Sequence, residues 1–149
     1  MKSKKSIKIN NESLASDYFD EAVRFYNNAK DILKDVKIVY KSYQDTKPVV
    51  KACGVGYIGM LKACDGYLIS RGIDKAKLPT SYQGYWQVLS KDLSHNGKVK
   101  SALKVAYENL HIFGYYRGGT GVSMIKEGFQ CAKFVIEHLS HKKIPKRGS

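Results

Sequence analysis

The stretch Arg117-Gly118-Gly119-Thr120-Gly121 combines residue types that could bind an anion. Glycines just before a helix expose backbone N–H groups, and the Arg117 guanidinium could close over a bound phosphate or carboxylate. The stretch lacks the Gly-Lys-Ser/Thr ending of a phosphate-binding loop, so it does not indicate nucleoside triphosphate chemistry. The competing interpretation is an ordinary turn between helices, in which Thr120 caps the next helix and the glycines supply backbone freedom.

A histidine and two tyrosines precede this turn. Tyr115, Tyr116 and Arg117 could stack on the bases of a single-stranded nucleic acid. An enzyme that used His111 with these residues would need them to converge around an enclosed pocket. A neutral histidine beside aromatic residues is more often a hydrogen-bonded packing residue, and no Cys or Ser is marked as a nucleophile by its neighbours. The segment is therefore a candidate ligand site with no catalytic residue assigned.

The histidines and cysteines do not form a metal-binding pattern. His138 and His141 lie three residues apart near the end of a predicted helix, with only Glu137 adjacent, and fit helix-end charges better than metal ligands. Cys53 and Cys64 would lie about 16 Å apart along one helix, which is too far for a disulfide. No Cys-x-x-Cys pair occurs. We expect neither a metal nor a cofactor, and free thiols in a reducing compartment.

The formal net charge of +13 is distributed unevenly. Eight positive charges and no negative ones lie in two terminal segments, which leaves +5 for the body of the chain. These eight are Lys2, Lys4, Lys5, Lys8, Lys142, Lys143, Lys146 and Arg147. A second group, Lys30, Lys34, Lys37 and Lys41, recurs at helical spacing and predicts a basic ridge. Both groups could contact nucleic acid, or they could be solvated and solubilising surfaces.

The longest apolar segment runs from Pro48 to Gly72 and is predicted to be the central helix. Small residues recur on one face at spacings of four, three, four and three: Ala52, Gly56, Gly59, Ala63 and Gly66. A stripe without bulky side chains lets another helix backbone approach closely. We expect this stripe to pack inside the monomer, because each interior glycine weakens a helix by about 1 kcal/mol and only packing can offset that.

The other segments predict further helices with short connections. A first helix starts near Asn11 or Ser13, a short one follows Thr80 or Ser81, a fourth covers about 98–115, and the last starts after Thr120. No segment requires a strand. The predicted fold is an all-α, up-and-down helical bundle of four main helices plus one short helix. Its parts are a basic N-terminal arm at 1–10, the bundle at 11–141 and a basic C-terminal tail at 142–149.

Two segments resemble known helical proteins. KACGVGYIGMLKACDGYLISRGI resembles the second helix of HEPN-like bundles, and NLHIFGYYRGGTGVSMIKEGFQCAKFVIEHL resembles their C-terminal helix pair. The motif LHIFGYY followed by IKEGF is similar to a small bacterial family of helical proteins of unknown function. Ribonuclease members of the HEPN group carry an Arg followed by a His near the start of the last helix. Here Val122, Ser123 and Met124 stand where that His should be, so the resemblance implies no RNA cleavage by this route.

The first functional hypothesis is a non-catalytic, HEPN-like interaction or dimerisation module, with a second copy or another protein as its partner. The alternative is an RNA-binding protein that uses the basic tails and the Tyr115–Arg117 turn. A small enzyme ranks last. The sequence contains no run of apolar residues long enough to span a membrane and no apolar stretch behind its basic N-terminus, so we expect a cytoplasmic location.

Overall fold

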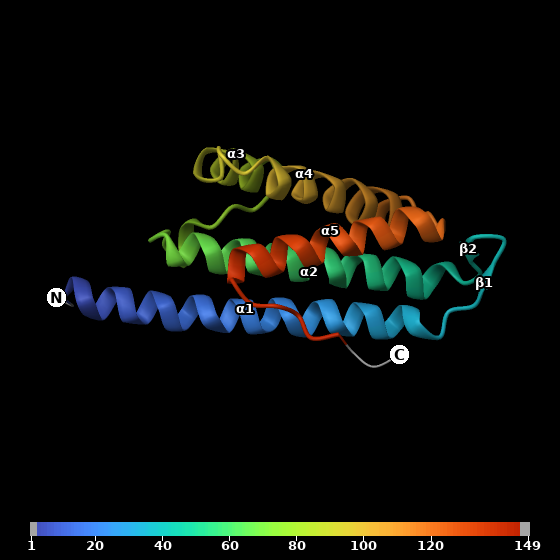
Figure 1. Cartoon of the computed structure of the whole chain (residues 1–149), viewed down its shortest axis with the longest axis horizontal. Coiled ribbons are helices and arrows are strands. Elements are labelled where there is room, and N and C mark those ends of the chain that lie inside the picture. The colour runs from blue at the N-terminus through green and yellow to red at the C-terminus, as the bar shows by residue number, and fades with distance from the viewer. Residues whose placement is uncertain (1–2, 147–149) are drawn as a thin grey trace.

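The computed structural model describes residues 3–146 and shows an all-α bundle, as predicted. In Figure 1, α1 and α2 run antiparallel along the long axis, α5 lies over α2, and α3 and α4 form the remaining layer. The helices are α1 (Lys4–Lys34), α2 (Thr46–Ser70), α3 (Tyr82–Asp92), α4 (Gly97–Ala106) and α5 (Val122–Ser140). A short 3-10 helix, η1 (Lys75–Lys77), a π-helix, η2 (Tyr107–Tyr116), and a hairpin of β1 (Ile38–Val39) and β2 (Ser42–Tyr43) complete the chain.

Helix α1 begins earlier than the sequence indicated. The prediction of a start near Asn11 or Ser13 is wrong, because α1 already includes residues 4–10 of the predicted N-terminal arm. The Ser3 hydroxyl caps it by accepting a hydrogen bond from the Ser6 N–H at 3.2 Å. Residues 3–10 are all exposed, so this part of α1 has no apolar face on the core and could not be found from periodicity.

Helix α2 carries the predicted stripe of small residues into the centre of the bundle. A Cβ atom at Gly59 would lie 3.1 Å from the carbonyl oxygen of Ala22 in α1, and one at Gly66 would lie 3.1 Å from that of Ala15. A Cβ atom at Gly56 would lie 2.5 Å from Cε1 of Phe129 in α5. These contacts lie within one chain, which confirms the expectation that the stripe serves packing inside the monomer.

The predicted fourth helix changes its hydrogen-bond pattern halfway along. It is an α-helix to Ala106 and then a π-helix, η2, in which each N–H reaches back five residues rather than four. The buried Asn109 amide links η2 to α5 by donating to the Met124 carbonyl oxygen at 2.9 Å. Such a long π-helical segment is uncommon, and π-helical turns occur frequently at functional sites.

The hairpin links the α1–α2 connection to the turn before α5, two segments that are far apart in the sequence. Its two-residue turn, Tyr40-Lys41, has φ values of 50° and 65°, which fit the right-handed twist of a hairpin. The Tyr43 N–H donates to the Thr120 carbonyl oxygen at 2.9 Å, and the Val122 N–H donates to the Lys41 carbonyl oxygen at 3.0 Å. The α1–α2 connection is therefore hydrogen-bonded to the turn before α5. No segment of the sequence required a strand, and the structure adds this short pairing to an otherwise all-α fold.

The described end of the chain packs back on the bundle. Ile144 is 5% exposed, and its N–H donates to the Glu137 carboxylate at 2.7 Å. This segment belongs to the predicted basic tail, yet its apolar residue joins the core. Lys2 and Arg147 of the predicted tails lie outside the described residues. Within residues 3–146, no helix is long and apolar enough to cross a membrane.

Candidate functional site

The glycine turn before α5 is shaped by packing. Gly118 has a φ of +66°, and a Cβ atom at Gly119 would lie 2.5 Å from ring atoms of Phe113. The Gly119 N–H donates to the Phe113 carbonyl oxygen at 2.7 Å, so it points at the chain rather than at a ligand. Gly121, not Thr120, is the N-cap residue of α5, and it provides no side-chain cap. The Thr120 cap expected from the sequence is therefore wrong.

Tyr116 and Arg117 lie together at the exposed start of this turn. The Tyr116 side chain is 74% exposed, and the Arg117 guanidinium carbon lies 6.0 Å from its ring centroid. The Arg117 N–H ends η2 by donating to the Ile112 carbonyl oxygen at 3.0 Å. An exposed aromatic ring beside a guanidinium offers stacking and charge to a ligand at the same place.

His111 and Tyr115 belong to a column of stacked rings that we call the aromatic ladder: Tyr57, Tyr82, Tyr107, His111 and Tyr115. Tyr82 of α3 stacks on Tyr107 with a centroid distance of 3.7 Å and an interplanar angle of 3°. Tyr107 stacks on His111 at 5.5 Å, and His111 stacks on Tyr115 at 5.8 Å. Tyr57 of α2 lies against His111 at 4.7 Å. Three elements thus contribute to one continuous aromatic surface.

Burial favours the uncharged forms of three rings of the aromatic ladder, Tyr57, Tyr82 and His111. Burial lowers the pKa of His111 and therefore favours the neutral imidazole. Burial, followed by the nearby Glu108 carboxylate, raises the pKa of the Tyr82 hydroxyl to about 12. The pKa of the Tyr57 hydroxyl is also raised, mainly by burial. At neutral pH, uncharged rings of this kind are better suited to stacking on other flat groups than to transferring protons.

The aromatic ladder is open at both ends. Near Tyr82 and Tyr107, an open pocket of about 330 Å³ is completed by Trp86, Lys104 and Glu108. At the other end the Tyr115 side chain is 49% exposed, and it lies over Gly54 of α2. A Cβ atom at Gly54 would lie 3.0 Å from the Tyr115 ring, so the glycine lets this ring approach the helix closely.

Sequence reasoning found only part of this surface. It singled out His111, Tyr115 and Tyr116, whereas Tyr57, Tyr82 and Tyr107 were not among its candidate site residues. The spacing of four between Tyr107, His111 and Tyr115 was the available signal. The contributions of α2 and α3 could not be seen without the tertiary structure.

The predicted basic ridge is not one helical face. Helix α1 ends at Lys34, whereas Lys37 and Lys41 lie in the segment of the hairpin, so the ridge prediction is wrong. Lys30 instead faces α5, where its ammonium lies 5.4 Å from the centroid of the Phe129 ring. Burial, then the charges of two lysines of α5, lowers the pKa of the Lys30 ammonium. The Lys41 carbonyl oxygen accepts a hydrogen bond from the Val122 N–H, which places Lys41 beside the glycine turn.

The histidines of α5 do not complete a metal site. The His138 ring shares a hydrogen bond of 2.9 Å with the Asn96 side chain, and its centroid lies 6.5 Å from that of His141. No group of three potential metal ligands occurs within the part of the chain that the structure describes. Cys53 and Cys64 are buried, and burial raises the pKa of the Cys53 thiol to about 12, so it is not a nucleophile at neutral pH.

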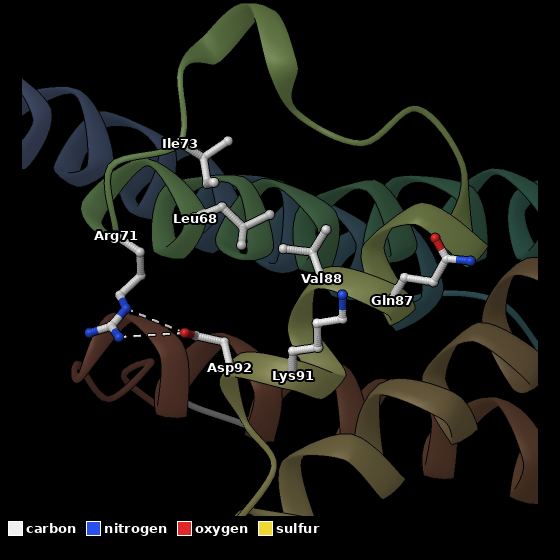
Figure 2. Close-up of a pocket in the computed structure, with 7 residues that line it drawn as sticks. All are labelled: Leu68, Arg71, Ile73, Gln87, Val88, Lys91 and Asp92. Carbon is white, nitrogen blue, oxygen red and sulfur yellow. Dashed lines mark hydrogen bonds and ion pairs between the residues drawn. The ribbon is translucent and has the colours of Figure 1, made fainter.

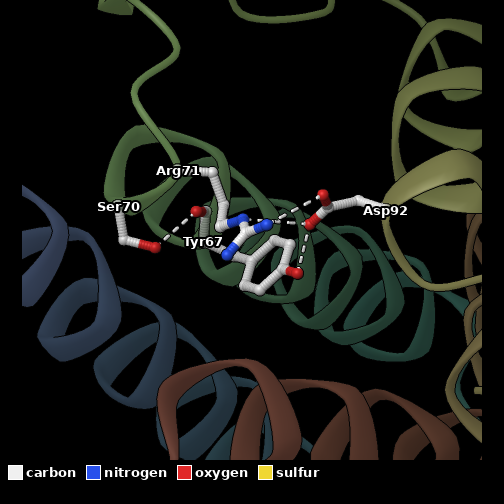
Figure 3. Close-up of polar contacts among 4 residues, drawn as sticks. All are labelled: Tyr67, Ser70, Arg71 and Asp92. Carbon is white, nitrogen blue, oxygen red and sulfur yellow. Dashed lines mark hydrogen bonds and ion pairs between the residues drawn. The ribbon is translucent and has the colours of Figure 1, made fainter.

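A separate polar cluster lies where α2 ends beside α3. Figure 3 shows the Tyr67 hydroxyl and the Arg71 guanidinium directed at the Asp92 carboxylate. The Tyr67 hydroxyl donates to Asp92, and Arg71 Nε lies 3.4 Å from its Oδ2. Ser70 is turned away and donates to the Tyr67 carbonyl oxygen at 2.6 Å. Arg71 and Asp92 of this cluster form one wall of an open pocket of about 520 Å³, which is seen in Figure 2.

Comparison with known proteins places the chain in a family. The family model described as a domain of unknown function, DUF5618, matches residues 17–141. A solved structure of a protein of unknown function from Dyadobacter fermentans is similar, with a TM-score of 0.73 and 32% sequence identity over 85% of this chain and 97% of that chain. No curated protein matches. The likeness to HEPN-like bundles remains a prediction. The chain belongs to the family of this domain of unknown function.

Proposed function

We propose that this domain is a non-catalytic helical binding module whose partner is single-stranded RNA. The observation that carries the proposal is the aromatic ladder, a stacked column of neutral rings from three elements with open ends. Bases stack on such rings whatever their sequence, and each base–aromatic contact contributes about 1–3 kcal/mol. The resemblance to HEPN-like bundles without their catalytic histidine supports a binding role rather than cleavage.

The charge of the chain supports a polyanionic partner. The net charge is +13, and Arg117 lies beside the exposed Tyr116 close to one end of the aromatic ladder. Lys104 lines the pocket at the other end. Cations at both ends of a stacking surface can hold the phosphates that flank stacked bases, and this attraction weakens as salt rises.

A second candidate is homodimerisation through the same surface. Ile58 of α2 is 46% exposed and Tyr115 is 49% exposed, and exposed apolar groups of this kind often mark protein interfaces. Two chains that each carry +13 repel one another, which disfavours this candidate at low salt and favours it as salt rises. The two candidates therefore respond to ionic strength in opposite directions.

Fluorescence anisotropy with a labelled single-stranded RNA of about twelve nucleotides tests the proposal. We expect binding at 50 mM salt and a loss of affinity of about 50-fold at 200 mM, if about four phosphates are neutralised. Tyr115→Ala should weaken binding by roughly 5- to 160-fold, which is the loss of one stacking contact. Arg117→Gln should weaken binding and reduce its dependence on salt.

Two matched variants control for the general effects of removing an exposed aromatic ring or a positive charge. Phe134→Ala removes an aromatic ring of similar exposure on α5, away from the aromatic ladder, and Lys75→Gln removes a charge on η1. Both should bind RNA like the unchanged protein. Light scattering coupled to size exclusion reports the oligomeric state in the same buffers. A salt-stabilised dimer that ignores RNA, or Tyr115→Ala binding as well as the control variants, would overturn the proposal in favour of the dimer or of another surface.

A further inference from the structure

The pocket between α2 and α3, which we call the α2–α3 pocket, has an apolar floor. Leu68 of α2 is 1% exposed and forms the base, and Ile73 packs partly buried on the core beside it. Val88 of α3 is 38% exposed and closes the opposite side. A volume of about 520 Å³ lies within the range of small-molecule sites.

Polar groups surround this floor on the side of α3. Figure 2 shows Lys91 extending beside Val88, with Gln87 one turn earlier on the same helix. Among residues 3–146, neither the Lys91 ammonium nor the Gln87 amide has an ion pair or a side-chain hydrogen bond. Both groups are therefore available to a ligand that rests on the apolar floor.

Arg71 and Asp92 form the remaining wall. The guanidinium approaches the carboxylate with Nε to Oδ2 and Nη2 to Oδ1 distances of 3.4 Å, longer than the 2.7–2.9 Å of a strong charge-assisted pair. The Arg71 side chain is 60% exposed, so its remaining N–H groups are accessible. The Tyr67 hydroxyl holds Asp92 in place from the other side (Figure 3). Asp92 thus contacts Arg71 only at long distances and has the Tyr67 hydroxyl as a second partner.

We propose that the α2–α3 pocket binds a small organic carboxylate that carries an apolar group. The carboxylate lies between the Arg71 guanidinium and the Lys91 ammonium, and the apolar group covers Leu68, Ile73 and Val88. Two cations and one anion line the pocket, so the lining attracts a negative charge. A guanidinium matches a carboxylate with paired hydrogen bonds, and an ammonium adds a point charge. This binding is independent of the aromatic ladder and of the proposed RNA binding.

Asp92 limits how tightly the α2–α3 pocket binds its ligand. Its carboxylate competes with the ligand for Arg71, so an arriving carboxylate must displace or share that contact. Asp92→Asn removes the competing charge and keeps an oxygen that accepts from the Tyr67 hydroxyl. We therefore expect this variant to bind the ligand more tightly, although it removes a residue of the pocket wall.

The test is a titration of isotope-labelled protein followed by NMR, with 4-phenylbutyrate as the probe. The neutral analogue 4-phenylbutanol has the same apolar group without the charge, and inorganic phosphate has charge without the apolar group. We expect 4-phenylbutyrate to shift the amide signals of residues around the α2–α3 pocket, with an affinity about tenfold above that of the alcohol. Phosphate should shift none of them at the same concentration.

The variants make the outcome decisive. Lys91→Gln should weaken binding about tenfold, and Asp92→Asn should strengthen it several-fold. Lys77→Gln and Asp74→Asn are the matched controls, because they change the net charge equally on η1 and its cap, outside the pocket lining. Equal affinity for acid and alcohol, shifts centred elsewhere, or an Asp92→Asn variant that matches Asp74→Asn would each overturn the proposal.

Discussion

Replacing Gly56 with Ala tests whether the bundle depends on a close approach at the centre of α2. The added Cβ atom would lie 2.5 Å from Cε1 and 3.1 Å from Cζ of Phe129. Carbon atoms in contact prefer about 3.5–4.0 Å, so the ring would have to move by about 1 Å. Phe129 is 1% exposed and packs edge-on against Tyr26 at 6.0 Å, so little space exists for that movement.

The size of the effect follows from two opposing terms. Overpacking a well-filled core costs about 1–3 kcal/mol, and the short contact puts Gly56→Ala near the upper end of this range. Alanine favours a helix interior over glycine by about 1 kcal/mol. We therefore expect the free energy of unfolding to fall by about 2 kcal/mol. Urea denaturation followed by circular dichroism measures this change, provided that the slope of the transition is unchanged.

Two further variants separate crowding from other effects. Gly97→Ala is the control, because no atom outside its chain neighbours and its own helix backbone lies within 4 Å of a Cβ atom at that position, and it should not destabilise the protein. Phe129→Leu shortens the opposing side chain, so the double variant with Gly56→Ala should be more stable than the sum of the single changes predicts. A Gly56→Ala protein as stable as the unchanged chain, or a double variant without this rescue, would refute the close approach.

Two other predictions concern His111 and the end of the chain. The lowered pKa of His111 means that the unfolded chain binds the proton more readily, so stability should fall as pH drops below about 6.5. His111→Phe keeps an aromatic ring without the imidazole. Urea denaturation at pH 7.5 and 5 should show a smaller difference in the free energy of unfolding for this variant than for the unchanged protein. An equal difference would exclude His111 as a cause of the loss of stability. Ile144→Ala should cost about 2 kcal/mol by emptying a buried position, whereas Lys143→Ala, at an exposed neighbour, should unfold at nearly the same urea concentration.

Elements with a clear apolar period or a good cap could be predicted from the sequence. Helix α5 was predicted to start after Thr120 and begins at Val122, within two residues of that prediction, because its apolar residues follow the helical period without a break. Ser81 caps α3 by accepting from the Gly84 N–H at 3.1 Å. Gly72 follows the end of α2 with a φ of +97°, which glycine adopts readily. In these places local chemistry and tertiary packing favour the same structure.

The candidate sites are formed by residues from different helices, so local sequence patterns do not reveal them. A spacing of four between Tyr107, His111 and Tyr115 fits an α-helix as well as a π-helix, so the change of hydrogen-bond pattern was not visible. The aromatic ladder is completed by α2 and α3, and the α2–α3 pocket by Arg71 and Asp92, which are distant in sequence. Both surfaces arise from tertiary contacts.

The hydrogen bonds between the hairpin and the turn before α5 have a consequence for how the chain folds. About half of the chain lies between Tyr43 and Thr120, so forming their contact closes a long loop and costs more entropy than the packing of α1 on α2. Helices that are neighbours in sequence can pair first, because local contacts form fastest. The amide protons of Tyr43 and Val122 should therefore become protected from solvent exchange late in folding, when the two connections finally meet.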